Sequence, residues 1–541
     1  MKYLFTVIVT LLSITMNAQM AITMPAEYEK NEGVFVTWPY QADYDSIIAE
    51  ISGYAASSGD VLIIYNPDSV SADTNYIRAF LQSTGNNHDN INFIPGYNNT
   101  FYIRQYGPVA GYGVFDQTLV RYYGDPVFDA YNRPADDSIP LQLANYRQTD
   151  YVQYTLAFEQ GNVLIDGEKN IFVSKHILEE NLPLTEAEVK QQLSEIYNIS
   201  DVTLLETPLH SGGGSMKSLD MFMKLLDSET VLFTEIPDTL PDHDVIENNV
   251  SIIEGLTNVY EAPYKIVRVK AAPLQNGKYD TTLNGEFRSY TNSLILNDLI
   301  LVPSYNNPDY DSAAFHAYKE NTYGMTVKMI DATKLSVLHA GIHTITKEEP
   351  QEHFLRISHQ KVENEQNYPG DEYTITCMAS ADVLIDNMWL YYCFNSDTAW
   401  QKTTVHLVCP THYGVIENIQ LTDTVHYYLE ANAVNSNSVT YPLSAPAGSF
   451  SFWFDITGTK QISSESNGEL IFPNPVSGSI TVKNLKKKVP FKIFDIRGKE
   501  IVKGTVAPQK KIPLNSSMQP GIYLLQLETT GDNRILKFIK K

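Results

Sequence analysis

"LILNDLILVPSY" (residues 294–305) is an apolar, β-rich run of the kind that forms buried strands. Similar runs recur upstream as "VLIIY" (61–65), "NVLIDG" (162–167) and "TVLF" (230–233). Amphipathic stretches lie between them, and "TEAEVKQQLSEIY" (185–197) has the apolar spacing of a helix. Strands that alternate with helices at this spacing predict an α/β domain, which we place at residues 20–355.

The pattern changes after residue 355 to short alternating strands without a helical period. These strands are "YTITCMA", "MWLYYCF", "TTVHLV", "VHYYLEANAV" and "GSFSFWFDI". Their spacing predicts a small Ig-like β-sandwich at residues 356–456. Residues 457–469 are polar and rich in Gly and Ser, which is typical of a linker. Residues 470–541 form a third predicted unit, all-β, with the strands "SITVKN", "FKIFDIRG" and "GIYLLQLET".

The first 19 residues have the features of a secretory signal peptide. Lys2 supplies a positive start, an apolar run follows, and Asn17 and Ala18 offer small residues for cleavage. Such a run is too short to span a bilayer, and no later segment has the ~18 uncharged apolar residues of a membrane helix. We therefore expect an exported chain without a transmembrane segment.

Charge is spread unevenly along the chain. Residues 471–541 hold 14 Lys and Arg against 4 Asp and Glu, which gives a formal charge of +10. The whole chain has a net charge of −24, so residues 1–470 have a net charge of −34. An acidic body repels phosphate backbones, which argues against nucleic-acid binding. The chain has three cysteines, Cys377, Cys393 and Cys409, an odd number that permits one disulfide and leaves at least one thiol. Their pairing stays open, and residues 1–376 have no thiol.

The C-terminal segments "FPNPVSGSITV", "FKIFDIRGKEIVKG" and "QPGIYLLQLETTGDNRILKFIKK" resemble the C-terminal sorting domain of the bacterial type IX secretion system. The Pro-Asn-Pro opening, the "D-x-x-G" turn, the "PGIY" strand and the basic end carry the resemblance. It implies the type IX secretion machinery as a partner and export across the outer membrane. The protein is then either released or attached to the cell surface.

Seven segments of the first domain together resemble the agmatine deiminase and bacterial peptidylarginine deiminase family. In chain order they are "MPAEYEKNEGVFVTWP" (24–39), "YIRQYGP" (102–108), "FDAYNRPADDSIP" (128–140), "FEQGNVLIDG" (158–167), "KSLDMFMKLLDSETVLF" (217–233), "SYTNSLILND" (289–298) and "GIHTIT" (341–346). The "YNRP…DD" stretch and the predicted sandwich favour the peptidylarginine branch. The resemblance implies a five-bladed α/β propeller of the pentein type with its site at the centre.

The family reaction hydrolyses a C–N bond of a guanidinium group. Carboxylates clamp the guanidinium nitrogens, a Cys thiolate attacks the central carbon, and a His protonates the leaving ammonia. By resemblance, the nucleophile position is Thr344 in "HAGIHTITKEEP", the acid/base position is Ser218, and one clamping Asp is replaced by Gln105. The second clamp, Asp220, is retained. A threonine hydroxyl has a far higher pKa than a thiol and needs a dedicated base.

Four positions could still hold a ligand. By resemblance, we predict a substrate-binding set of Asp220, Asn292, Tyr102 and Arg133, with Arg133 as a candidate carboxylate reader. Asp220 is equally compatible with a structural role at the end of a strand.

Other polar segments receive simpler interpretations. His339 and His343 are four residues apart but lack the Glu of an "HExxH" pattern, so we expect no metal there and no cofactor. His210 stands beside "SGGGS", which lacks the Lys-Ser/Thr of a phosphate loop, and we expect a solvent-exposed loop. "NNPDYDS" (306–312) lacks the length and the Glu of an EF-hand loop, which favours an ordinary acidic turn.

The leading hypothesis is a secreted, catalytically degenerate deiminase-family protein that binds a guanidino or cationic peptide-like ligand without turnover. One alternative is an active hydrolase that uses Thr344 or water, with His343 or His210 as base. The other is a structural or adhesive surface module in which the pocket is vestigial.

Overall fold

The computed structural model describes residues 22–541 apart from short gaps. The gaps are 70–73, 86–88, 116, 129–132, 209–216, 283–284, 365–369, 409–410, 455–469, 473–475, 484, 486, 496–498, 509, 516–517 and 529–532. The predicted signal peptide, His210, Cys409 and the predicted linker therefore lie outside the described residues. The chain divides into two compact units, residues 1–456 and 457–541.

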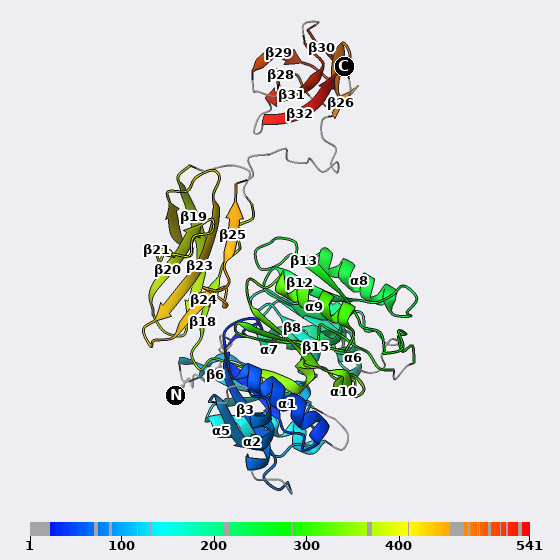
Figure 1. The fold of residues 1–541 in the computed structure, drawn as a ribbon, viewed down its shortest axis with the longest axis vertical. Coiled ribbons are helices and arrows are strands. Elements are labelled where there is room, and N and C mark those ends of the chain that lie inside the picture. The colour runs from blue at the N-terminus through cyan, green and yellow to red at the C-terminus, as the bar shows by residue number, and fades with distance from the viewer. Residues whose placement is uncertain are drawn as a thin grey trace, which may run out of the picture. The chain divides into compact units, whose positions relative to one another are not determined.

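The first part of unit 1 consists of five small mixed sheets (Figure 1). Two sheets have four strands each: β17 (Thr346–Pro350), β2 (Asn31–Thr37), β3 (Asp60–Tyr65) and β4 (Ile91–Pro95) form one, and β1 (Ile22–Thr23), β5 (Val109–Phe115), β6 (Thr118–Val127) and β7 (Asp150–Ala157) form the other. The remaining three sheets have three strands each. They are β8 (Val163–Ile165), β9 (Asn170–Ser174) and β10 (Asp201–Leu205); β11 (Met223–Leu225), β12 (Thr230–Glu235) and β13 (Lys265–Lys270); and β14 (Leu294–Leu296), β15 (Leu299–Ser304) and β16 (Thr326–Asp331).

One strand pattern repeats in all five sheets. A strand pairs antiparallel with the next strand of its sheet, which pairs in parallel with a further strand, as in β8–β9–β10 and β14–β15–β16. The last sheet closes the ring, because β17 near residue 350 pairs antiparallel with β2 near residue 31. "LILNDLILVPSY" is thus two strands, β14 and β15, with Asn297 in the left-handed region (φ 56°) at the turn.

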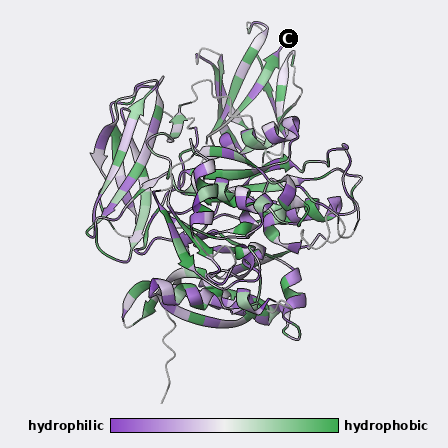
Figure 2. Cartoon of the chain, turned by 60° about the horizontal axis from the view of Figure 1, so that its bottom comes forward, coloured by the Kyte–Doolittle hydropathy of each residue, from purple (hydrophilic) through white to green (hydrophobic). Residues whose placement is uncertain are grey.

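Helices join the parallel strands, as βαβ connections require. They are α1 (Ala42–Ala55), α2 (Thr74–Ser83), α4 (Pro134–Asp137), α5 (Ile139–Arg147), α6 (His176–Glu180), α7 (Glu186–Tyr197), α8 (His243–Glu254) and α9 (Pro308–Lys319); α10 (Thr333–Ser336) precedes the last sheet. The predicted helix at 185–197 is confirmed as α7, and Thr185 closes a capping box with Glu188. Hydrophobic residues, green in Figure 2, concentrate on the strands between these helices.

Residues 355–454 are all-β and share one hydrophobic core. One sheet holds β18 (Leu355–Ser358), β19 (Glu372–Ala381) and β22 (His412–Glu417); the other holds β21 (Gln401–Thr404), β20 (Ile385–Phe394), β23 (Thr424–Ala433), β24 (Ser438–Tyr441) and β25 (Phe450–Trp453). Sequence reasoning missed β18, β22 and β24, and it extended "TTVHLV" past the end of β21. Cys377 and Cys393 are buried free thiols in this region.

The all-β region contacts the five-sheet part through a buried arginine. Arg356 in β18 donates from Nε to a Glu29 carboxylate oxygen at 2.8 Å and from Nη1 to the Gly167 carbonyl at 3.1 Å. Tyr323 packs edge-on against Phe450, with ring centroids 4.8 Å apart. These contacts explain why residues 1–456 form one compact unit.

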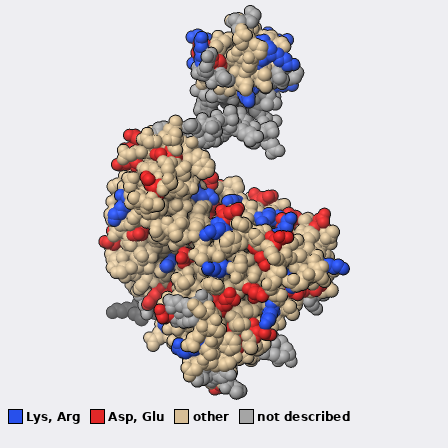
Figure 3. All heavy atoms as spheres, in the orientation of Figure 1, with Lys and Arg blue, Asp and Glu red and all other residues tan. Residues whose placement is uncertain are grey.

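Unit 2 is a separate all-β body with its own core. Its strands are β26 (Leu470–Phe472), β27 (Ser479–Lys483) and β30 (Lys511–Pro513) in one sheet, and β29 (Glu500–Val506), β28 (Val489–Asp495), β31 (Gly521–Glu528) and β32 (Asn533–Lys540) in the other. The three strands expected in this unit correspond to β27, β28 and β31. Lysine and arginine side chains dominate the charged surface of this unit in Figure 3, in keeping with its positive net charge.

Candidate functional site

The short turns that lead into the five sheets carry the residues of interest. Gln105 lies in α3 (Ile103–Tyr106) ahead of β5, and Glu159 precedes the 3-10 turn η1 (Gln160–Asn162) ahead of β8. Ser218 and Asp220 lie at η3 (Leu219–Met221) ahead of β11, Asn292 precedes β14, and Thr344 lies in η4 (His343–Ile345) ahead of β17. Because the five sheets form a closed ring, these five entry turns converge.

A cavity of about 130 Å³ lies at this convergence. Its lining residues are Arg104, Gln105, Glu159, Gly161, Asn162, His176, Glu180, Lys217, Ser218, Asp220, Met221, His339 and Thr344. The structure thus brings together all four positions that the resemblance assigns to catalysis. We call this space the central cavity.

Thr344 is held with its hydroxyl already engaged. Its Oγ1 donates to Asn292 Oδ1 at 3.2 Å and accepts from the Gly341 backbone N–H at 3.2 Å. The Thr344 backbone N–H also donates to Asn292 Oδ1, at 3.1 Å. Only glycine fits at 341, since a Cβ there would overlap the Asn292 side chain. Asn292 therefore positions the loop, and the hydroxyl proton is directed at an amide oxygen rather than at a base.

His343 faces away from Thr344. Its Nδ1 lies 2.7 Å from Asp220 Oδ2, and its Nε2 lies 3.0 Å from Glu27 Oε2. Burial, with the positive charges of Arg104 and Lys224 nearby, lowers the pKa of His343 to about 3. Both ring nitrogens lie against carboxylates and not against the Thr344 hydroxyl, so His343 is not placed to take a proton from Thr344.

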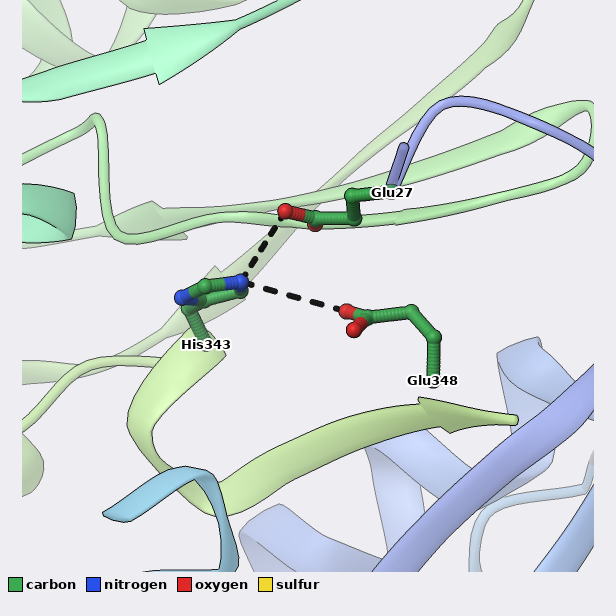
Figure 4. Close-up of side chains that lie close together, drawn as sticks. All are labelled: Glu27, His343 and Glu348. Atoms are coloured by element: carbon green, nitrogen blue, oxygen red, sulfur yellow. Dashed lines mark hydrogen bonds and ion pairs between the residues drawn. The ribbon is translucent and has the colours of Figure 1, made fainter. Parts of the chain in front are cut away.

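Glu27, His343 and Glu348 form a cluster behind the cavity (Figure 4), and their possible ligand atoms lie within 4.8 Å of one another. The carboxylates are already paired with cations. Arg104 binds both Glu348 oxygens, and the fully buried Lys224 pairs with Glu27. Lys347 Nζ lies 3.7 Å from Glu348. Three cations around two carboxylates oppose a bound divalent metal ion, so we interpret the cluster as a buried ion-pair network.

Gln105 is engaged by the protein's own arginine. Arg133 Nη1 donates to Gln105 Oε1 at 2.8 Å, while its Nε and Nη2 bind Asp136 and Thr100, each at 2.7 Å. The guanidinium also lies over the rings of Tyr102 (5.9 Å from its carbon to the centroid) and Phe128 (4.8 Å). All three nitrogens of Arg133 thus have partners within the protein.

Two carboxylates that sequence reasoning missed face the cavity. Burial raises the pKa of Glu159 to about 7, although the nearby positive charge of Arg133 lowers it. Burial and the Glu159 charge raise the pKa of Glu180, in α6, to about 8. Glu159 lies within the quoted "FEQGN" segment, so an acidic residue shortly before a predicted strand was the available signal. Nothing in the local sequence marks Glu180.

The other residues singled out from the sequence differ in whether they line the central cavity. Asn292 and Tyr102 do not line it, although Asn292 holds Thr344. His339 lines it and has a left-handed backbone (φ 57°). "NNPDYDS" forms the start of α9, where Asp311 accepts from the backbone N–H groups of Tyr305 and Asn307 at 3.0 Å each. That arrangement is a helix start, as the acidic-turn interpretation expected.

Comparison with known proteins assigns the fold and the family. Residues 23–350 match the family described as Porphyromonas-type peptidyl-arginine deiminase. The chain belongs to this family. A Legionella pneumophila relative of the deiminase domain, named "putative agmatine deiminase", is 23% identical over 352 residues, which cover 62% of this chain and 97% of the relative. The agmatine deiminase of Enterococcus faecalis superposes with a TM-score of 0.52 and 16% identity, over 61% of this chain and 96% of that structure. At this identity the superposition shows the deiminase fold alone.

The C-terminal unit has its own match. Residues 470–541 match the secretion system C-terminal sorting domain. This deiminase-family chain is therefore exported across the outer membrane by the type IX system, to the cell surface or the extracellular space. Within the described residues no helix is long and apolar enough to cross a membrane.

Proposed function

We propose that this protein is a secreted, catalytically degenerate deiminase-family member that binds a guanidino or cationic peptide-like ligand without hydrolysing it. The state of Thr344 carries the proposal. Its hydroxyl donates to Asn292 Oδ1, and His343 points both nitrogens at carboxylates. A hydroxyl without a general base is a weak nucleophile.

The acid/base position supports the same conclusion. Ser218 lines the cavity where the family resemblance implies a histidine, and a serine cannot protonate leaving ammonia at neutral pH. Catalytic groups act as a unit, so losses at 105, 218 and 344 are not compensated by retaining Asp220. Asp220 is buried beside the cavity and keeps one carboxylate that can pair with a cationic ligand.

Three domain assignments belong to this proposal. We assign residues 20–355 to the deiminase domain, residues 356–456 to an Ig-like sandwich and residues 470–541 to the sorting domain. Two antiparallel sheets around one core support the sandwich assignment.

Turnover and binding are tested on the full-length chain. Incubated with agmatine, free arginine and arginine-containing peptides, it should release no ammonia above buffer, while the same compounds raise its melting temperature. Asp220→Asn should abolish the thermal shift, whereas Asp309→Asn, at an exposed position in the first turn of α9, should leave it unchanged.

The two alternatives predict different results. Ammonia release that Thr344→Ala abolishes would establish an active hydrolase and overturn the proposal. No thermal shift with any of these compounds would instead favour a structural or adhesive module with a vestigial pocket.

A further inference from the structure

The outer edge of β7 is completed at one point by a side-chain amide. β7 is the last strand of its sheet, and among the described strands it pairs with β6 alone. At Ala157, Asn181 Oδ1 accepts from the backbone N–H at 2.8 Å, and Asn181 Nδ2 donates to the backbone carbonyl at 2.7 Å. A neighbouring strand would make the same pair of bonds. The edge of β7 thus already accepts a peptide-like amide at Ala157.

A groove of about 530 Å³ lies beside β7, ahead of Ala157, and α7 forms its other wall. Its lining residues are Gln153, Tyr154, Thr155, Glu188, Gln191, Gln192, Glu195 and Ile196. Within the described chain, no backbone hydrogen bond joins Gln153, Tyr154 or Thr155 to a segment outside their sheet. The register against β6 also shifts between Gln153 and Ala157, and such a bulge leaves strand backbone unpaired. Backbone groups in the groove are therefore available to another chain.

The groove is negatively charged. Glu188 and Glu195 are exposed, and the described residues that line the groove include no Lys or Arg. Hydrogen bonding from the Thr185 backbone lowers the pKa of Glu188, so this carboxylate is ionised at neutral pH. Gln191 and Gln192 lie about one helical turn from Glu188, and their amides can both donate to and accept from a peptide backbone. An extended chain with basic side chains matches this set of groups.

A short stretch of β7 leads from the groove to the central cavity. Thr155 lines the groove, and Glu159, four residues further on, lines the cavity. Asn181, which completes the β7 edge, directly follows Glu180, which also lines the cavity. Four extended residues span about 13 Å. Residues within about four positions of a cavity-bound arginine are therefore within reach of the groove.

We propose that the groove between β7 and α7 binds the basic, extended chain that flanks an arginine held in the central cavity. The preferred ligand is then a cationic segment of a peptide or protein, in preference to free arginine or agmatine. This inference rests on the proposed function and narrows its ligand to a polypeptide.

The test compares three probes by calorimetry at pH 7 on the full-length chain. The first is Nα-acetylarginine amide. The second is a nine-residue peptide with a central arginine and with lysines among serines on both sides, and the third has glutamates in place of those lysines. The lysine peptide should bind about tenfold or more tighter than the amide, whereas the glutamate peptide should bind no tighter than the amide.

One charge of the groove can be removed on its own. Glu195→Gln should weaken binding of the lysine peptide about two- to fivefold and leave the affinity for the amide unchanged. Glu186→Gln is the matched control, because Glu186 is exposed on the same helix, pairs with Lys190 at 2.8 Å and does not line the groove. This control should keep both wild-type affinities.

The possible results separate the groove from the cavity. If the lysine peptide binds no tighter than the amide, or if the glutamate peptide gains as much, the groove inference is overturned and the proposed function stands. Equal weakening by Glu195→Gln and Glu186→Gln also overturns the inference, since the effect is then one of overall charge. Binding of none of the three probes overturns both. Should Glu195→Gln fail to fold, the three probes on the wild-type chain still decide.

Discussion

Arg133 donates from Nη1 to Gln105 Oε1 at 2.8 Å, so an arginine of the protein itself engages the side chain at the position where the family resemblance implies a clamping aspartate. The same guanidinium is anchored to Asp136, which also accepts from the backbone N–H groups of Asn99 and Thr100. Gln105 is thus fixed at the rim of the cavity with its oxygen occupied. Gln105, Arg133 and Asp136 are thus parts of one hydrogen-bonded arrangement.

Removing Arg133 tests this arrangement. Arg133→Gln should lower the free energy of unfolding by about 1–3 kcal/mol, because Asp136 and Gln105 each lose a partner in a half-buried setting. Arg133→Lys should fall between wild type and Arg133→Gln, since an ammonium keeps the charge but cannot reach three partners as a planar fork. Urea denaturation followed by circular dichroism measures both. Identical midpoints for all three chains would contradict the structural role.

Restoring the family residues tests the placement of the site. The triple variant Gln105→Asp, Ser218→His and Thr344→Cys should release ammonia from agmatine or arginine peptides at a rate at least ~100-fold above any single variant. A matched chain that carries Thr344→Ser with the other two changes keeps a hydroxyl and should stay inactive. Equal rates for the cysteine and serine versions would show that position 344 does not present the nucleophile.

Guanidino affinity should rise with pH. The charged groups near Glu159 are Arg133, Lys217 and Asp220, and those near Glu180 are Glu159, Glu179, Lys217 and His176. Both carboxyls have raised pKa values, about 7 and about 8, so they gain negative charge as pH increases through this window. We expect arginine amide to bind about tenfold tighter at pH 9 than at pH 6. Citrulline amide should show no such rise.

The double variant Glu159→Gln and Glu180→Gln is the control for the pH effect. It should bind arginine amide with the same affinity at both pH values, measured by calorimetry. A wild-type affinity that falls between pH 6 and pH 9 would have the wrong sign for these two groups.

The buried ion pair Arg104–Glu348 should be far more costly to break than a surface pair. Arg104→Met leaves the buried Glu348 with only Lys347, 3.7 Å away, as a cationic partner and should cost about 3–5 kcal/mol of unfolding free energy. Lys334→Met breaks an exposed pair with Asp43 and should cost at most about 1 kcal/mol. Denaturant midpoints for the two variants give the comparison. Similar losses of unfolding free energy for the two variants would show that the Arg104–Glu348 pair is not excluded from water.

Much of the architecture could be predicted from local patterns. The helix at 185–197, the β-rich runs and the switch to all-β sequence after residue 355 depend on periodicity over a few residues. The positions 105, 218, 220 and 344 followed from motif resemblance, and the structure places all four around one cavity. The ring closure between β17 and β2 joins segments about 310 residues apart and left no local signal.

Electrostatic partners were not predictable in the same way. Glu27 and His343 are 316 positions apart, and Arg104 and Glu348 are 244 apart. The local sequence of α6 does not distinguish Glu180 from other polar helix residues, and its proximity to Glu159 depends on the fold.

The sequence by itself determined which functional groups stand at positions 344, 218 and 105, because a threonine, a serine and a glutamine carry the same donors and acceptors in any fold. The tertiary structure alone decided where those groups point. It directs the Thr344 hydroxyl at Asn292 and holds both His343 nitrogens against carboxylates. The direction of each hydrogen bond depends on atoms that folding brings together from different sheets. The order of residues along the chain does not show which of these atoms will be neighbours.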